Sequence, residues 1–187
     1  MRTVYLIRHG LPDFPEGKRM CLGRTDLPLG QEGFRQAAEA AALLKDRPLS
    51  AVFSSPLRRA VQTASALNHP IILLEELQEL CPGEWDGLTF DEIRERYPEL
   101  YTIRATNKTV TPPGAEPNDV GLRRFQKGME KAAELCEGDF AVVAHGAVIQ
   151  LFLDAVCGHG WKPGYAEIVH LKLENGVFSL KEETNHA

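Results

Sequence analysis

The sequence has no apolar run long enough to cross a membrane, no internal repeat and no cluster of cysteines. A membrane-spanning helix needs about 20 consecutive apolar residues, and the apolar runs here are far shorter. The four cysteines, Cys21, Cys81, Cys136 and Cys157, are scattered and form no C-x-x-C pair. We therefore expect free thiols, and the absence of a signal-peptide pattern before residues 3–7 leads us to expect a cytoplasmic location.

A basic surface is also lacking, because the net charge is -5 and the isoelectric point is near 5.7. That balance argues against a nucleic-acid or membrane partner. The histidines lack the spacing of metal ligands, so we predict no metal and no cofactor. With 187 residues, 43% of them apolar, the chain has the size and composition of one globular domain spanning residues 1–187.

Short apolar runs alternate with helical patterns along most of the chain. Residues 4–7, 49–53, 71–74 and 140–144 are rich in β-branched or aromatic residues, which is typical of buried strands. This alternation predicts a three-layer α/β/α sandwich around a largely parallel sheet. Asn-Gly at residues 175–176 favours a tight turn, so we predict a closing antiparallel hairpin over residues 168–180.

Two amphipathic helices are predicted between these strands. In the first, apolar residues recur at helical spacing and Pro48 follows the helix; in the second, Asn118 is the expected N-cap and Gly138 the expected stop. The first stripe consists of Phe34, Ala37, Ala38, Ala41 and Leu44. Residues 82–118 interrupt the alternation with four prolines and a Thr89-x-x-Glu92 capping box, so we interpret them as a lid or loop insertion.

Polar residues with catalytic chemistry follow the predicted strands. The carboxyl ends of parallel strands meet at one edge of the sheet, where ligands bind. Arg8 and His9 follow the first strand, Arg58 and Arg59 the second, and His145 the fourth. Arginine pairs with phosphate oxygens through two parallel hydrogen bonds, and backbone N–H groups of Gly146 and Ala147 at a helix start would add donors.

Phosphoryl transfer fits this set of residues. Neutral imidazole attacks phosphorus readily, and neighbouring arginines disfavour its protonated form. On this basis either His9 or His145 could be the nucleophile. A carboxyl group beside them could protonate the leaving oxygen, and Glu79 is the candidate, with Glu84 as the alternative.

The motifs resemble those of the phosphoglycerate mutase-like histidine phosphatases over nearly the whole chain. The matching stretches are residues 6–10 (Leu-Ile-Arg-His-Gly), 23–29, 54–64, 77–87 and 144–146. The resemblance implies a phosphoglycerate mutase-like fold and a phosphohistidine intermediate on His9. It also implies that Arg59 rather than Arg58 binds phosphate, that Glu79 is the proton donor, and that His145 is the second catalytic histidine.

The resemblance further implies that the ligand is a small phosphorylated metabolite. The expected substrate-binding residues are Arg8, Gly23, Arg59, His145, Gly146 and Ala147. The short chain and its modest insertion at residues 82–118 favour a phosphatase over a mutase. The compact length and residues 83–87 (Gly-Glu-Trp-Asp-Gly) look most like the α-ribazole phosphatase branch. Two alternatives remain, a phosphoglycerate mutase and a catalytically silent module that binds a phosphorylated ligand.

Two stretches depart from the family pattern. Leu11, Pro12 and Asp13 follow Gly10, where relatives often have an acidic or polar residue and then Thr or Ser. Residues 113–117 read Pro-Gly-Ala-Glu-Pro, where relatives typically have Pro-Gly-Gly-Glu-Ser. The first departure predicts that a side-chain contact to substrate is missing. The second predicts a differently shaped pocket rim and therefore concerns substrate choice.

Overall fold

The computed structural model describes residues 1–107 and 109–181, and its centre is a six-stranded sheet in the order β3-β2-β4-β1-β5-β6. The strands are β1 (Arg2–Arg8), β2 (Leu49–Ser54), β3 (Ile71–Leu73), β4 (Asp139–Ala144), β5 (Ile168–Glu174) and β6 (Val177–Leu180). The helices are α1 (Gln31–Leu44), α2 (Arg58–Ser65), α3 (Phe90–Arg96), α4 (Pro98–Thr106), α5 (Asn118–Glu134) and α6 (Gly146–Cys157). The predicted α/β class is confirmed.

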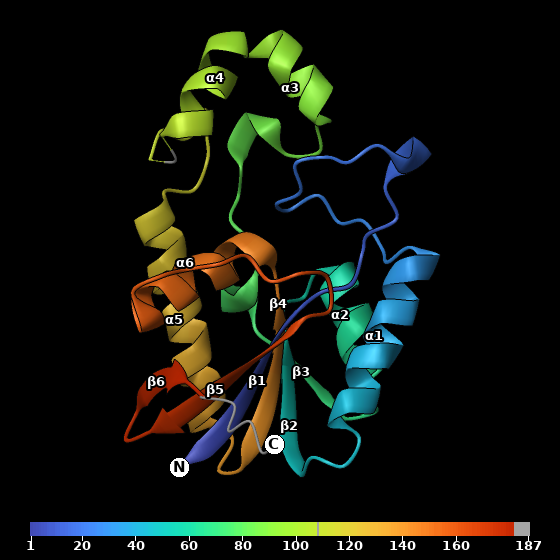
Figure 1. The fold of residues 1–187 in the computed structure, drawn as a ribbon, viewed down its shortest axis with the longest axis vertical. Coiled ribbons are helices and arrows are strands. Elements are labelled where there is room, and N and C mark those ends of the chain that lie inside the picture. Colours follow the sequence, from blue (N-terminus) through green and yellow to red (C-terminus); the bar gives the residue numbers. More distant parts are fainter. Residues whose placement is uncertain (108, 182–187) are drawn as a thin grey trace, which may run out of the picture.

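The central strands are buried on both faces, which explains their continuous apolar runs. Along β1, Val4 and Leu6 belong to the apolar cluster that α5 and α6 cover, whereas Tyr5 and Ile7 belong to a second cluster. Figure 1 shows α1 and α2 against that second face and α5 and α6 against the first. The three predicted layers therefore follow from the alternation of side chains along each strand.

Strands β1 to β4 run parallel to one another. Strand β5 pairs antiparallel with β1 and forms an antiparallel hairpin with β6. Asn175 and Gly176 form its turn with φ angles of 52° and 79°. This left-handed conformation is the one that an Asn-Gly turn adopts. The predicted closing hairpin is confirmed.

Three local predictions were wrong. Strand β3 lies at the sheet edge, so Ile72 and Leu73 are 40% and 53% exposed instead of buried. On α1, Phe34 is 49% exposed, and the helix buries Gly33 and Ala40 besides Ala37 and Leu44. The N-cap of α5 is Pro117, not Asn118, because proline fixes φ near the value the cap adopts here, and the helix ends at Glu134, before Gly138.

Residues 82–118 stand over the carboxyl ends of the parallel strands. This segment contains α3 and α4, which lie at the top of Figure 1. The predicted capping box is present: the Thr89 hydroxyl accepts from the Glu92 N–H, and the Glu92 carboxylate accepts from the Thr89 N–H. Across the described ranges, no helix combines the length and apolarity that a membrane span requires.

Candidate active site

Three strand ends bring the predicted site residues together. Arg8 is the last residue of β1 and His9 follows it, while Arg59 lies in the first turn of α2, after β2. His145 is the N-cap of α6, directly after β4. Because β1 and β4 pair in parallel, with Arg8 opposite Ala144, His9 and His145 lie side by side with their ring centroids 5.1 Å apart.

The hydrogen bonds of the two histidines define which nitrogen is available. His9 Nδ1 lies 2.7 Å from the Gly10 carbonyl oxygen, which can only accept, so Nδ1 carries the proton and Nε2 keeps its lone pair. His145 Nε2 lies 2.7 Å from the Ser55 hydroxyl, and its Nδ1 is buried without a partner.

Both imidazoles are neutral at physiological pH. Burial lowers the pKa of His9 and of His145 well below the ordinary value, and the positive charge of Arg59 lowers both further. His9 is 5% exposed and His145 is fully buried. A neutral His9 supplies the lone pair that a nucleophile needs.

Arg59 is fully buried, and its guanidinium is held by backbone carbonyls. Nη1 donates to Thr25 O at 2.9 Å and Nη2 to Gly23 O at 2.8 Å, whereas Nε has no partner. Arg58, by contrast, is exposed on the helix surface. Arg59, and not Arg58, is therefore the arginine whose charge acts on the two histidines, and its contact with phosphate stays a prediction.

Arg8 is held from the opposite side of the site. Its Nη1 donates to Pro163 O at 2.7 Å, and its Cζ lies 3.9 Å from the centroid of the Tyr165 ring. The Arg8 Nε is buried without a partner. Burial lowers the pKa of Arg8 and of Arg59.

Glu79 lies at the N-terminus of α6. Its Oε2 accepts from Ala147 N, and its Oε1 accepts from Val148 N and from Leu80 N, each at 3.0 Å. The helix dipole favours an acidic group at this position. The alternative carboxylate, Glu84, accepts instead from the Tyr97 hydroxyl on the exposed lid.

The remaining predicted binding residues have partners within the protein. Gly23 holds Arg59 through its carbonyl, and its N–H donates to Asp86. The Ala147 N–H is taken by Glu79, so it reaches a ligand only if that carboxylate turns away. Gly146 lies beside Lys162: a Cβ on this glycine would be 2.4 Å from Lys162 Cε and 3.1 Å from Arg8 Nε. Substrate contacts by these three residues stay predictions.

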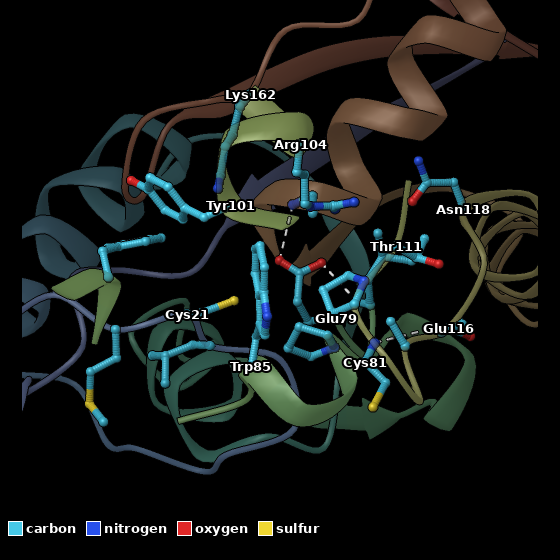
Figure 2. Close-up of a pocket in the computed structure, with 18 of the residues that line it drawn as sticks. Cys21, Glu79, Cys81, Trp85, Tyr101, Arg104, Thr111, Glu116, Asn118 and Lys162 are labelled. Atoms are coloured by element: carbon cyan, nitrogen blue, oxygen red, sulfur yellow. Dashed lines mark hydrogen bonds between the residues drawn. The ribbon is translucent and has the colours of Figure 1, made fainter. Parts of the chain in front are cut away.

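A cavity of about 470 Å³ adjoins Glu79, between the start of α6 and residues 82–118. Glu79, Trp85, Tyr101, Arg104 and Lys162 lie around it (Figure 2). Most of the other lining side chains are apolar, including Met20, Leu22, Leu80, Pro82, Phe90 and Pro112. Burial raises the pKa of Cys21 in this wall to about 11, so its thiol stays protonated.

Two residues of the site escaped prediction, Lys162 and Tyr165, both in the loop between α6 and β5. Lys162 lines the cavity, and within residues 1–107 and 109–181 it has neither an ion pair nor a hydrogen-bonded side-chain partner. Tyr165 lies over Arg8 and beside His9, at 5.8 Å between ring centroids. No motif or periodicity marks either position, because only the path of the loop brings it to the site.

Metal-ligand groups of three or more His, Cys, Asp or Glu side chains do not occur in the part of the chain that the structure describes. All four cysteines lie within that part and carry free thiols.

Comparison with known proteins points to one family. The model of the histidine phosphatase superfamily (branch 1) matches residues 4–185. A Bacillus subtilis protein named as the uncharacterised phosphatase PhoE is 30% identical over 185 residues, which cover 96% of this chain and 87% of that protein. Bacillus stearothermophilus YhfR has a similar solved structure, with 26% identity, a TM-score of 0.86 and coverage of 96% of this chain and 95% of that one.

A higher identity is found with the bifunctional protein Rv2228c of Mycobacterium tuberculosis, at 38% over 156 residues. The matched region covers 80% of this chain but 43% of that protein. This chain therefore corresponds to less than half the length of the first curated relatives it matches.

Proposed function

This chain belongs to branch 1 of the histidine phosphatase superfamily, and from that premise we propose that it hydrolyses a small phosphomonoester through a phosphohistidine on His9. The observation that carries the proposal is the hydrogen bond from His9 Nδ1 to Gly10 O, which leaves Nε2 free as the nucleophile. His145 is less suited to attack because its Nε2 is bound to Ser55.

An anion fits the polar atoms that surround His9. Arg8 Nε, Arg59 Nε and His145 Nδ1 are buried and have no partner in the protein. The Ser55 hydroxyl accepts from Leu57 N, so its proton is free to donate to His145 Nε2 and the proton of a neutral His145 then lies on Nδ1. Buried donors without partners are costly, and a phosphate group would satisfy them.

The reaction follows from these positions in two steps. His9 Nε2 attacks phosphorus and forms the N–P bond while the bond to the leaving oxygen breaks. Arg8, Arg59 and His145 stabilise the charge on the equatorial oxygens, and Glu79 protonates the leaving oxygen. Water, deprotonated by Glu79, then attacks phosphorus, and the N–P bond breaks to release phosphate. The two arginine charges and the N–H donor of neutral His145 take the place of a metal, so we propose a metal-independent reaction.

The cavity beside Glu79 supports a leaving group larger than a three-carbon acid. A proton donor must lie next to the leaving oxygen, so the remainder of the substrate extends into this space of about 470 Å³. Trp85 and Tyr101 offer aromatic surface there, which suits a ring-bearing alcohol. α-Ribazole 5′-phosphate has such a leaving group, and we propose it as the first substrate to test, in a cytoplasmic enzyme.

The test is labelling with a phosphomonoester, quenched in alkaline detergent because the N–P bond is acid-labile, together with phosphate release in the presence of EDTA. The panel contains an aryl phosphate, 3-phosphoglycerate and α-ribazole 5′-phosphate. We expect the wild type to form an acid-labile, base-stable phosphoprotein and His9→Ala to form none. Turnover by His9→Ala near the wild-type rate would overturn the nucleophile assignment. Isomerised phosphoglycerate would indicate a mutase, and phosphate-competitive binding without release would indicate a binding module.

A further inference from the structure

The loop between α6 and β5 is bound directly to the backbone of Arg8 and His9. Arg8 N donates to Glu167 O at 3.2 Å, and Ala166 N donates to His9 O at 3.3 Å. Ala166 has a φ of 56°, a left-handed conformation that costs a non-glycine residue roughly 1 kcal/mol. The loop thus accepts strain at the residue next to Tyr165, which brings this side chain to the active site.

Tyr165 fixes the plane of the Arg8 guanidinium. The Arg8 Cζ lies 3.9 Å from the ring centroid, well within the range of a cation–π interaction. One edge of the guanidinium is also held, because Nη1 donates to Pro163 O at 2.7 Å. The contact with the ring face and the hydrogen bond to Pro163 O together fix the orientation of the guanidinium. Its Nε is buried and unpaired beside Gly146.

This support differs from that of Arg124, another half-buried arginine of the chain. Arg124 is paired with Glu116, whose two oxygens lie 2.8 Å from Arg124 Nε and Nη2. In the described part of the chain, no carboxylate forms an ion pair with Arg8. A carboxylate would orient the guanidinium but neutralise it, whereas an aromatic face and a carbonyl orient it and leave its full charge for an anion.

We infer that Tyr165 is a positioning residue that holds the Arg8 guanidinium toward the phosphoryl group without neutralising its charge. The inference rests on the proposed function for its role in turnover. The loop between α6 and β5 would thus take part in phosphate recognition through Tyr165, a residue that belongs to none of the sequence motifs. The Tyr165 side chain also forms a hydrogen bond with Arg8, so Tyr165→Phe separates the contribution of the hydroxyl from that of the ring face.

A double-mutant cycle between Tyr165 and Arg8 tests this inference. Tyr165→Leu, Tyr165→Phe, Arg8→Ala and the pair Tyr165→Leu with Arg8→Ala are compared in two assays: kcat/KM for an aryl phosphate, and the Kd for inorganic phosphate by calorimetry. We expect Tyr165→Leu to lower kcat/KM and to raise the Kd by roughly 10-fold each. Tyr165→Phe keeps the ring face and loses only the hydroxyl, so its effect on both quantities should be smaller. In the Arg8→Ala background, Tyr165→Leu should cost less than about twofold.

An equal cost of Tyr165→Leu with and without Arg8 would overturn the inference, as would a Leu variant that matches the wild type. The binding arm separates this outcome from failure of the proposed function, because phosphate affinity does not require turnover. If the wild type binds phosphate but hydrolyses no ester, the proposed function fails and the cycle on Kd still decides the role of Tyr165. Tyr165→Met replaces the Leu variant if thermal unfolding shows that the latter does not fold.

Discussion

The two ends of the active site are built in different ways. At the phosphate end, His9, Arg59 and His145 are buried, and each has at least one hydrogen bond to a strand end or a neighbouring loop. At the leaving-group end, the cavity walls come largely from residues 82–118, where Phe90 is 43% exposed and no residue of α4 is buried. The proposed chemistry therefore lies at the buried end, and the proposed substrate choice lies at the more exposed end.

This difference follows from how each end is supported. The phosphate end uses the parallel sheet, whose registers fix the strand ends relative to one another. At the leaving-group end, loop segments and short helices carry the walls, and Trp85 packs there with its ring 6.3 Å from that of Tyr97 and 6.4 Å from that of Tyr101. Sites on regular elements are more precisely placed than sites on loops. Variants at the two ends should therefore affect rate and substrate range separately.

The largest effect is expected at the phosphate end, from Arg59→Ala. Loss of one preorganised donor to the transition state costs roughly 10²–10³ in kcat. Arg58→Ala is the matched control, because Arg58 precedes Arg59 on the same helix but is exposed. Steady-state rates with an aryl phosphate check the pair. Similar losses in the two variants would contradict the assignment of the phosphate contact to the buried arginine.

The rate loss caused by Glu79→Gln should depend on the acidity of the leaving group. The amide keeps the size of the side chain beside Ala147 and Val148 but cannot donate the catalytic proton. We expect kcat to fall roughly 10²-fold with an alkyl phosphate and much less with a nitrophenyl phosphate, whose phenolate leaves without protonation. A linear free-energy plot over several esters measures this. An equal loss for all esters would assign Glu79 a role other than proton donor.

A smaller effect, confined to the leaving-group end, is expected from Ala105→Trp. Ala105 lines the cavity on α4, so the larger ring would fill space that a bulky leaving group occupies. We expect kcat/KM for a naphthyl phosphate to fall roughly 10-fold, with glycerol phosphate little changed. Ile103→Trp on the same helix is the control, because Ile103 is exposed and lies outside the lining. Parallel losses for both esters would show that the cavity does not hold the leaving group.

The same division determined what the sequence could predict. His9, Arg59 and His145 follow strands, and a strand that is buried on both faces leaves a clear apolar signal just before them. The order of the strands could not be derived, but the rule that carboxyl ends carry the ligand site needs only their common direction. The strand pattern and the family motifs therefore pointed to His9, Arg59 and His145 together, and their roles in the reaction stay predictions.

Prediction failed where only tertiary contacts decide. Lys162 and Tyr165 reach the site because the loop after α6 turns back over β1, and Ala166 adopts a positive φ that no sequence rule expects of alanine. The exposure of β3 depends on which strand occupies the edge of the sheet, which an apolar run does not reveal. In both cases the local sequence pattern does not indicate which elements pack against the segment.

The rigid phosphate end should also make the fold sensitive to acid. Burial holds the pKa of His9 and His145 well below their ordinary value of 6.5, so the unfolded chain binds more protons than the folded chain between the two values. Stability is therefore complete above about pH 6.5 and declines as the pH falls toward the folded-state values, by up to about 1.4 kcal/mol per pH unit for each histidine.

Urea unfolding between pH 8 and pH 5 measures this dependence, and His145→Gln should reduce its slope by about half. His159→Gln is the control, because His159 is exposed in the loop after α6 and its replacement should leave the slope unchanged. An unchanged slope in His145→Gln would mean that the acid sensitivity arises elsewhere. A reduced slope would show that the burial that keeps His145 neutral at the phosphate end is also a source of the acid sensitivity. The exposed lid has no buried histidine and should not contribute in this way.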